Sequence, residues 1–359
     1  MRRDECGVKS SLKPRAFTQH AASPMKTEIL PTHTKSLFGT AVQRAVQLLR
    51  AGEVVVLPTE TVYGLAANAL DEKAVAKIFQ IKGRPEHNPI IVHVVGNDMA
   101  KNCVRNFPEL AEKLSNAFWP GPLTMVLPRS KTIPNNVTAG GETVGVRWPS
   151  HPIMQAVIRE CGFPLAAPSA NLSNQVSPTN AHHVFSQLAG KVALIVDGGQ
   201  SQVGIESTVL DLTVSPPRIL RPGMIHAESL AAVAGNLQLS TFNLQPSTLR
   251  SPGMLAKHYS PKAKLVILNW CDESELVSQL STFNFQLSTT HVIAHTKIPA
   301  GFPPENVSVI PHDAEAFARA LYGELHRCDA AGAELIVVEL LPETPEWSGI
   351  ADRLRRAAA

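Results

Sequence analysis

The sequence predicts an α/β fold, with a mixed sheet flanked by helices in its first part and a smaller α/β unit in its second. Short apolar runs alternate along the chain with segments of helical periodicity, which is the pattern of α/β proteins. Several neighbouring strands are joined by connections too short for a parallel crossover, which favours a mixed sheet. A change of composition after residues 221–223 indicates that a second unit follows.

The elements of the first part follow one another closely. Apolar spacing predicts a helix over residues 37–51 that Gly52 ends, and Asp71 is the expected N-cap of a helix that reaches Ile81. Further helices are expected over residues 108–118, 152–161, 179–189 and 226–234. Strands are expected over residues 54–57, 89–94, 123–127, 143–147, 165–167, 193–196 and 207–212.

The second part begins with a polar, Ser/Thr-rich stretch, residues 236–250. It contains QLSTFN at 238–243, which recurs at 279–284; one short duplication is too little for a repeat protein and favours an inserted low-complexity loop. From residue 263 the alternation is Rossmann-like, although no strand is followed by G-x-G-x-x-G. The expected strands are 264–270, 291–296, 307–310 and 334–340, and the expected helices are 272–280, 313–331 and 349–358.

Composition and charge exclude several classes of protein. Of 359 residues, 44% are hydrophobic and 18% are charged, which is typical of a soluble globular protein. Five of the 33 basic and two of the 30 acidic residues lie in positions 1–24, which leaves 28 of each in residues 25–359. A neutral body is not a polycation that coats nucleic acid. We expect residues 1–24, which are polar and unpatterned, to be a disordered extension.

Other features indicate a cytoplasmic protein. No apolar run approaches the length of a membrane span, and the N-terminal stretch lacks the apolar core of a secretory signal. The five cysteines are widely spaced and form no C-x-x-C, so neither a disulfide framework nor a zinc site is indicated.

Two polar segments next to predicted strands are candidate ligand-binding loops. PTETVYGL, residues 58–65, follows a buried strand and brings two threonines, a carboxylate and a tyrosine, although an ordinary strand-to-helix connection would also fit. In residues 82–89, Lys82 and Arg84 flank a glycine between prolines, which suits a phosphate clamp; a solvated basic turn is the alternative. No Walker A sequence occurs.

Arg147 is a third candidate, because it ends an apolar predicted strand. A buried arginine needs an anion, either a ligand or a structural carboxylate of the protein. Small polar residues follow another apolar strand at 168–171, and Arg221-Pro222-Gly223 offers a further rigidly placed cation. No G-x-S-x-G elbow or H-E-x-x-H helix occurs, so the pattern indicates catalysis by positioning and charge rather than by a protein nucleophile.

Taken in order, these segments resemble the YrdC-type threonylcarbamoyl-AMP synthases over residues 37–225. The motifs are PTETVYGL, KGRP at 82–85, WPGPLT at 119–124, VGVRWP at 144–149, PSAN at 168–171, GIESTV at 204–209 and RPG at 221–223. The distal part resembles the extra domain of the longer, two-domain branch, with SPGM at 251–254 and HYSP at 258–261 as its linker motif and DRLRRAA at 352–358 as its closing helix. The resemblance implies a YrdC-like twisted mixed sheet with flanking helices, plus a small Rossmann-like domain.

The resemblance also implies a reaction. L-threonine, bicarbonate and ATP would give L-threonylcarbamoyl-AMP and pyrophosphate, which makes the enzyme a nucleotidyltransferase that serves the N6-threonylcarbamoyladenosine modification of tRNA. Magnesium would arrive with the triphosphate, since no protein metal site is expected. Transient contact with tRNA or with the downstream threonylcarbamoyl transferase is a further expectation, and no membrane partner is expected.

The same resemblance assigns residues to the two substrates. Arg147 would pair with the threonine carboxylate, Lys82 would add positive potential at the phosphates, and Tyr259 would close over the nucleotide as a lid. The residues expected to contact L-threonine are Thr61, His93, Arg147 and Ser207, with the backbone at Ala167. The residues expected to contact ATP are Arg84, Asn88, Thr143, Ser169, Ser177, Arg221 and Tyr259, and the catalytic cations are Lys82, Arg84 and Arg147.

The expected domains are a YrdC-like catalytic domain over residues 25–235, a linker with the lid motif over 236–262 and a C-terminal α/β domain over 263–359. Two alternative functions are an RNA-binding or ribosome-associated module and a carbamoyl-transfer domain. The neutral body argues against the first. The lack of paired zinc-type cysteines argues against the second.

Overall fold

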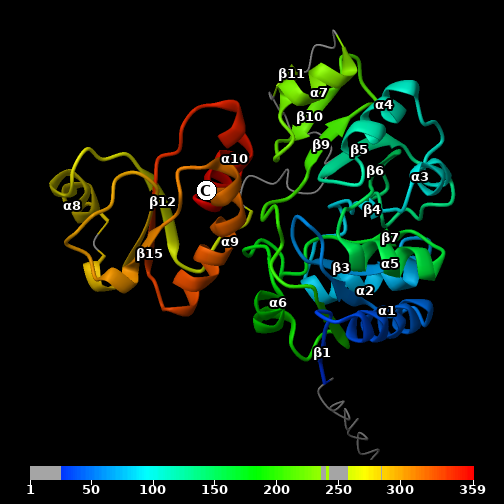
Figure 1. Ribbon diagram of the computed structural model, residues 1–359, viewed down its shortest axis with the longest axis horizontal. Coiled ribbons are helices and arrows are strands. Elements are labelled where there is room, and N and C mark those ends of the chain that lie inside the picture. The colour runs from blue at the N-terminus through cyan, green and yellow to red at the C-terminus, as the bar shows by residue number, and fades with distance from the viewer. Residues whose placement is uncertain (1–25, 236–239, 242–257, 284) are drawn as a thin grey trace, which may run out of the picture.

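The computed structural model describes residues 26–235, 240–241, 258–283 and 285–359 (Figure 1). The expected extension at 1–24, the SPGM part of the linker motif and most of the first QLSTFN copy lie outside the described residues. Two α/β parts lie side by side, each around its own sheet. The predicted fold class is confirmed.

The larger sheet is mixed, as the short connections predicted. Its strand order is β1-β8-β2-β3-β7-β4-β6-β5-β9-β10-β11, with parallel pairs such as β4 with β6 and antiparallel pairs such as β5 with β6. The strands are β1 Glu28–Pro31, β2 Val55–Leu57, β3 Gly64–Asn68, β4 Val92–His93, β5 Leu123–Pro128, β6 Thr143–Arg147, β7 Leu165–Ala166, β8 Leu194–Asp197, β9 Thr208–Asp211, β10 Arg218–Arg221 and β11 Ser240–Thr241.

Alternating side chains of the central strands bury both faces of this sheet. On β2, Val55 and Leu57 join one core cluster, whereas Val56 joins the other. The helices α1 and α5 cover the first face and pack against each other, and α2, α4 and α6 contribute to the cluster on the second. The helices of this part are α1 Lys35–Arg50, α2 Glu72–Lys82, α3 Asn97–Cys103, α4 Glu109–Phe118, α5 Pro152–Cys161, α6 Ala181–Leu188 and α7 Ala227–Ala234.

Local capping explains why α2 begins and ends where it does. The Asp71 carboxylate accepts hydrogen bonds from the backbone N–H groups of Lys73 and Ala74, as its predicted N-cap role requires. At the other end Gly83 adopts a left-handed conformation with φ +58°, which a residue with a side chain rarely adopts. The cap turns the chain directly into the segment that carries Arg84.

Four strands and an α-helix were not expected from the sequence: β1, β3, β10, β11 and α3. Strand β3 pairs antiparallel with β2, so PTETVYGL joins two strands rather than a strand and a helix. In the other direction, the strand expected at 89–94 shrinks to β4, Val92–His93. Pro89 has no N–H to donate, and Ile90 donates its N–H to Val137 outside the sheet.

The smaller sheet is wholly parallel, with the order β12-β15-β13-β14, which confirms the expected Rossmann-like alternation. Its strands are β12 Lys264–Leu268, β13 Thr290–Ala294, β14 Val307–Val309 and β15 Leu335–Glu339, and its α-helices are α8 Glu273–Ser281, α9 Ala314–Ala330 and α10 Ser348–Ala357. Short 3-10 helices lie at Leu287–Thr289, Pro304–Asn306 and Pro345–Trp347.

The two parts share a buried apolar contact, formed on the C-terminal side by α9 and α10 (Figure 1). Val62, Val176 and Ile205 of the first part belong to the same core cluster as Phe317 and Leu321 of α9. Gly349 lies against Gly223, where an added Cβ would come within 2.9 Å of the Gly223 Cα, so no larger side chain fits. The closing helix therefore packs tightly against the RPG loop.

Candidate active site

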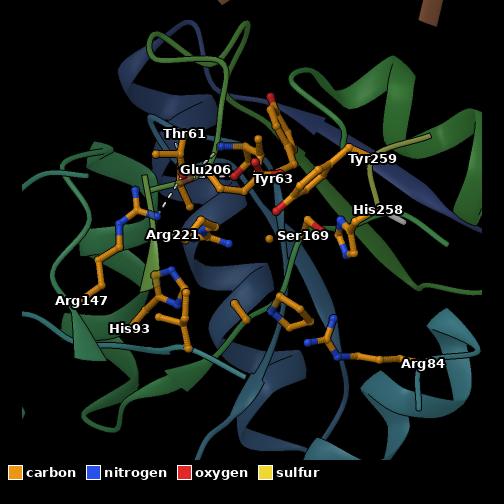
Figure 2. Close-up of a pocket in the computed structure, with 16 residues that line it drawn as sticks. Thr61, Tyr63, Arg84, His93, Arg147, Ser169, Glu206, Arg221, His258 and Tyr259 are labelled. Carbon is orange, nitrogen blue, oxygen red and sulfur yellow. Dashed lines mark hydrogen bonds between the residues drawn. The ribbon is translucent and has the colours of Figure 1, made fainter. Parts of the chain in front are cut away.

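A polar pocket lies where loops of the large sheet meet the segment His258–Tyr259 (Figure 2). His93 and Arg147 are register partners at the ends of β4 and β6, which places them side by side. The lining residues are Thr59, Thr61, Val62, Tyr63, Gly64, Arg84, Ile91, His93, Arg147, Ala167, Pro168, Ser169, Glu206, Arg221, His258 and Tyr259. The cavity volume is about 50 Å³, and the buried side chains of His258 and Tyr259 form part of its wall.

One end of the pocket is built around the buried guanidinium of Arg147. Its Nε donates to the carbonyl of Gly121 at 3.2 Å, and its Nη1 donates to the Thr61 hydroxyl at 2.9 Å. Its Nη2 forms an ion pair of 2.7 Å with Glu60. A guanidinium has five N–H groups, so these three contacts orient it and leave N–H groups on the terminal nitrogens for another anion. The structural carboxylate that sequence reasoning left open is therefore Glu60.

His93 adds a neutral imidazole beside this arginine. Burial and the nearby Arg147 cation lower its pKa to about 3, so the ring carries no charge at neutral pH. Its Nδ1 is buried and accepts or donates no hydrogen bond among the described residues. Ala167 also lines the pocket, and its N–H donates to the carbonyl of Ile91.

The other end of the pocket carries Arg84 (Figure 2), and carbonyls of its own loop hold this side chain in place. Its Nε donates to the carbonyl of Asn88 at 3.2 Å, and its Nη2 donates to the carbonyl of Pro89 at 2.9 Å. Burial lowers the pKa of Arg84 to about 10, which still leaves the group charged at neutral pH. Asn88 thus contributes its backbone from behind Arg84 and does not line the pocket.

Lys82 does not line the pocket either. Its ammonium donates to the carbonyl of Ser169 at 2.6 Å, the carbonyl of Asn171 at 2.5 Å and the Asn171 side chain at 3.2 Å. These contacts use all three ammonium N–H groups. Burial and the neighbouring Arg84 hold the pKa of Lys82 well below its usual value. In this structure Lys82 orients the loop at 169–171, which carries Ser169 into the pocket.

Arg221 lies between the two ends and is tied to GIESTV. Its Nε donates to the carbonyl of Ser207 and its Nη2 donates to the Ser207 hydroxyl, both at 3.1 Å. That hydroxyl also lies 2.8 Å from the Thr124 hydroxyl, and Ser207 is buried behind the pocket surface. Ser177 is likewise buried, and its hydroxyl donates to Glu206 at 2.6 Å.

Thr143 is the predicted site residue that the structure leaves apart. It begins β6, and Arg147 ends it, so the two lie about 13 Å apart along the strand. It is absent from the lining of the pocket.

Tyr259 lines the pocket and has an unusual backbone conformation. Its φ is +63°, a conformation uncommon for a bulky residue, and its side chain is only 1% exposed. The ring lies edge-on to His258 and stacks on Tyr322 of α9, with centroids 4.0 Å and 6.0 Å away. Burial raises the pKa of Tyr259 above its usual value, so the hydroxyl keeps its proton at neutral pH.

Sequence reasoning named no specific role for Glu206 or His258, and it placed Glu60 in a candidate binding loop without pairing it with Arg147. Glu206 was present in a recognised motif, GIESTV, where it is the one charged residue; a carboxylate that becomes buried needs a cation or hydrogen-bond donors. That cation, Arg353, lies in the other part of the molecule, so no spacing rule could have connected the two. Among the described residues, no group of three or more His, Cys, Asp or Glu side chains could hold a metal ion.

A large mixed α/β sheet with flanking helices, and a pocket lined by three arginines and several hydroxyls, are typical of YrdC-like proteins. Residues 47–223 match the family model Sua5_yciO_yrdC, described as "Telomere recombination", and residues 225–359 match "Threonylcarbamoyl-AMP synthase, C-terminal domain".

Relatives match over most of the chain. The threonylcarbamoyl-AMP synthase of Pyrococcus abyssi is 38% identical over 88% of this chain and 94% of its own length. That of Bacillus subtilis is 42% identical over 88% and 92%. The crystal structure of P. abyssi Sua5 complexed with L-threonine has a TM-score of 0.84 and 36% identity, over 92% of this chain and 97% of that one. The chain belongs to the threonylcarbamoyl-AMP synthases of the two-domain Sua5 type, which are enzymes that use ATP.

Proposed function

We propose that this enzyme forms L-threonylcarbamoyl-AMP and pyrophosphate from L-threonine, bicarbonate and ATP. The threonine amine captures carbon dioxide as a carbamate, and a carbamate oxygen then attacks the α-phosphorus of ATP. Such a step needs alignment and charge neutralisation more than a protein nucleophile. The observation that carries the proposal is the convergence of Arg84, Arg147 and Arg221 on one buried pocket. The matches support this function and not the RNA-binding or carbamoyl-transfer alternatives.

L-threonine binds at the Arg147 end in this proposal. The terminal N–H groups of Arg147 receive the threonine carboxylate, since a guanidinium pairs with a carboxylate in a bidentate manner. Thr61 and the neutral His93 offer hydrogen bonds to the rest of the amino acid, with Ala167 beside them and Ser207 behind. Glu60 keeps Arg147 oriented from the side away from the substrate.

ATP binds at the Arg84 end, with Arg221 between the two substrates. Arg84, Arg221 and Ser169 contact the nucleotide from the pocket wall. Lys82 and Asn88 hold two of these residues from behind, and Ser177 lies under Glu206. Thr143 remains a predicted contact of the nucleotide. Magnesium enters on the triphosphate, where it neutralises phosphate charge.

Tyr259 acts as a lid over the nucleotide. The cavity of about 50 Å³ is smaller than the ~300 Å³ or more of small-molecule sites, so ATP enters when Tyr259 moves out of its present place. Closure afterwards keeps water from the carbamate and the adenylate.

The product serves the threonylcarbamoyl modification of tRNA, and a downstream threonylcarbamoyl transferase is the acceptor. We place the reaction in the cytoplasm. None of the helices in the described part of the chain is both long and apolar enough to cross a membrane.

Pyrophosphate release tests the proposal. The protein mixed with bicarbonate, ATP and magnesium should release pyrophosphate only when L-threonine is added. Threonine-independent release, or none at all, would contradict the proposed reaction. In a parallel thermal-shift assay, threonine and ATP together should raise the melting temperature by more than the sum of their separate effects, as coupled binding requires.

A further inference from the structure

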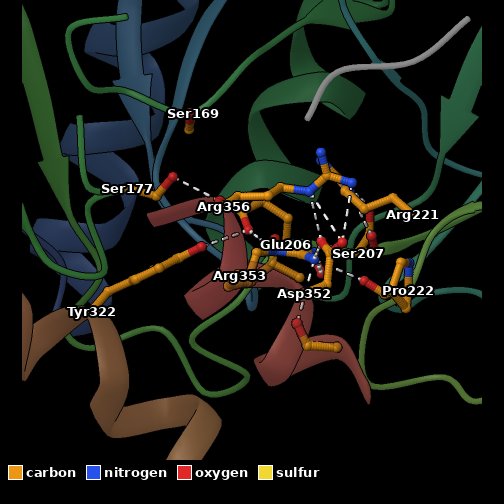
Figure 3. A network of polar contacts seen from close by, with 12 residues as sticks. Ser169, Ser177, Glu206, Ser207, Arg221, Pro222, Tyr322, Asp352, Arg353 and Arg356 are labelled. Atoms are coloured by element: carbon orange, nitrogen blue, oxygen red, sulfur yellow. Dashed lines mark hydrogen bonds and ion pairs between the residues drawn. The ribbon is translucent and has the colours of Figure 1, made fainter. Parts of the chain in front are cut away.

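The Glu206 carboxylate is buried between the two domains and is bound from both (Figure 3). From the catalytic domain, the Ser177 hydroxyl donates to its Oε1 at 2.6 Å. From the C-terminal domain, Tyr322 of α9 donates to Oε2 at 2.9 Å, and Arg353 of α10 donates its Nε to the same oxygen at 2.7 Å. The C-terminal domain thus supplies the cation for a carboxylate that lines the pocket of the catalytic domain.

The Arg353 guanidinium is itself completely buried and saturated with contacts. Its Nη2 donates to the Glu206 carbonyl at 3.1 Å, and its Nη1 donates to the Pro222 carbonyl at 3.0 Å. Asp352 adds a second carboxylate at 2.8 Å. Arg353 therefore contacts both GIESTV and RPG, the two motifs that also hold Ser207 and Arg221.

We propose that Arg353 is a positioning residue of the ATP site: it holds the Glu206 carboxylate and offsets its negative charge, so that this carboxylate does not draw Arg221 away from bound ATP. Arg353 reaches no substrate itself. This inference rests on the proposed function, because it assigns Arg221 to ATP. It gives the C-terminal domain a defined part in the reaction, namely to control the charge at the wall of a pocket that lies in the other domain.

The electrostatics of the cluster support this role. Burial opposes ionisation of Glu206, but Arg353 first and Arg221 second lower its pKa to about 2, so it is fully charged at neutral pH. Glu206 in turn acts on Arg221 and opposes the loss of charge that burial imposes there. Removal of Arg353 would leave the buried Glu206 carboxylate without its main cation, which is costly. We expect the carboxylate then to attract Arg221 more strongly and to draw it away from a phosphate.

The first experiment compares Arg353→Met with Arg355→Met in the full-length chain. Arg355 lies on the same helix but is exposed, and its Nε donates to the Ala351 carbonyl of its own helix. Threonine-dependent pyrophosphate release is measured over a range of ATP concentrations. R353M should raise the KM for ATP about tenfold or more, and R355M should leave it unchanged. A merely structural role would lower the amount of active enzyme without moving this KM.

The double variant Glu206→Gln/Arg353→Met tests the charge directly. It removes the carboxylate charge that R353M exposes, so the KM for ATP should return to within about threefold of the wild-type value. A KM as high as that of R353M alone would overturn the proposal, as would an unchanged KM in R353M.

If R353M fails to fold, the Tyr322→Phe variant tests the proposal instead. It removes one hydrogen bond to Glu206, and its KM for ATP should rise about threefold; no rise would overturn the proposal.

These outcomes are separate from failure of the proposed function. If the wild-type enzyme releases no threonine-dependent pyrophosphate, the proposed reaction is wrong and the variants report nothing about it. If the wild-type enzyme is active and the KM values for ATP do not respond, only the role of Arg353 is refuted.

Discussion

Two buried arginine–glutamate pairs of the same length flank the pocket, and they differ in what they connect. Glu60 and Arg147 are 2.7 Å apart and both belong to the catalytic domain. Glu206 and Arg353 are also 2.7 Å apart, but they join the catalytic domain to the closing helix α10. In the first pair the arginine faces the pocket, whereas in the second pair the glutamate does.

This difference shows how similar pairs can serve opposite ends of one reaction. In the proposed reaction, the first pair orients a cation toward the threonine carboxylate. The second pair, in the role proposed for Arg353, holds a carboxylate so that it does not compete for the arginine assigned to ATP. Buried pairs of this kind add little net stability over apolar replacements, but breaking one partner leaves a costly unpaired charge. Single substitutions can therefore test the role of each pair separately.

The largest effect is expected from Arg147→Ala. It removes the group assigned to the threonine carboxylate, and kcat/KM for threonine should fall about 1000-fold, which corresponds to about 4 kcal/mol. Steady-state kinetics with varied threonine provides the measurement. To separate folding from binding, Glu60→Gln/Arg147→Met removes both charges and should fold while remaining equally inactive. Unchanged threonine kinetics in either variant would remove Arg147 from its role.

Breaking the interdomain pair should cost the most stability. Glu206→Ala leaves Arg353 buried without its main partner, so the free energy of unfolding should fall by about 3 kcal/mol or more. Urea denaturation provides the measurement. The matched control is Glu109→Ala, because Glu109 forms an exposed ion pair with Lys113 on one helix, and its loss should be within experimental error. Equal effects of the two substitutions would contradict a tightly coupled interface.

Two pocket histidines predict how stability depends on pH, and each lies beside one of the pairs. Burial and Arg147 lower the pKa of His93 to about 3, and burial lowers that of His258 to about 3 although Glu206 opposes the shift. Unfolded histidines titrate near pH 6.5, so the unfolded state binds more protons below that pH. The contribution of these two neutral histidines to the free energy of unfolding should be fully present above about pH 6.5. It should fall as the pH decreases, by up to about 2 kcal/mol for each histidine at pH 5. A urea midpoint unchanged between pH 7 and pH 5 would refute these neutral imidazoles.

A smaller effect, confined to one substrate, is expected from Glu60→Ala. Arg147 loses one of its three orienting contacts, and the KM for threonine should rise about tenfold, or about 1.4 kcal/mol. The KM for ATP should stay constant, whereas in R353M the KM for ATP is expected to rise. If Glu60→Ala changed the KM for ATP as much as that for threonine, the two pairs would not act on separate ends of the pocket.

Much of the fold could be predicted from the sequence because its elements carry strong local signals. Asp71 caps α2 as expected, and the apolar runs at β5 and β6 form strands there. Strand β3 was missed because GLAAN contains no β-branched or aromatic residue. It is a strand because β2 pairs with it and the surrounding core buries it, which is a property of the whole sheet.

The candidate site could also be predicted from the sequence only in part. Motif resemblance assigns Thr61, His93 and Arg147 to one substrate, and all three side chains line the same pocket. The motifs do not reveal that the Lys82 ammonium donates its hydrogen bonds to backbone carbonyls. Nor can they pair Glu206 with Arg353, since long-range contacts between domains leave no periodic pattern in the sequence.

The most direct test of the central claim follows the carbon of bicarbonate. The wild-type enzyme is incubated with labelled bicarbonate, L-threonine, ATP and magnesium, and the nucleotide products are separated at once. The account predicts a labelled AMP derivative that forms in step with pyrophosphate and requires both threonine and ATP. Pyrophosphate release with no label in any nucleotide product would contradict it.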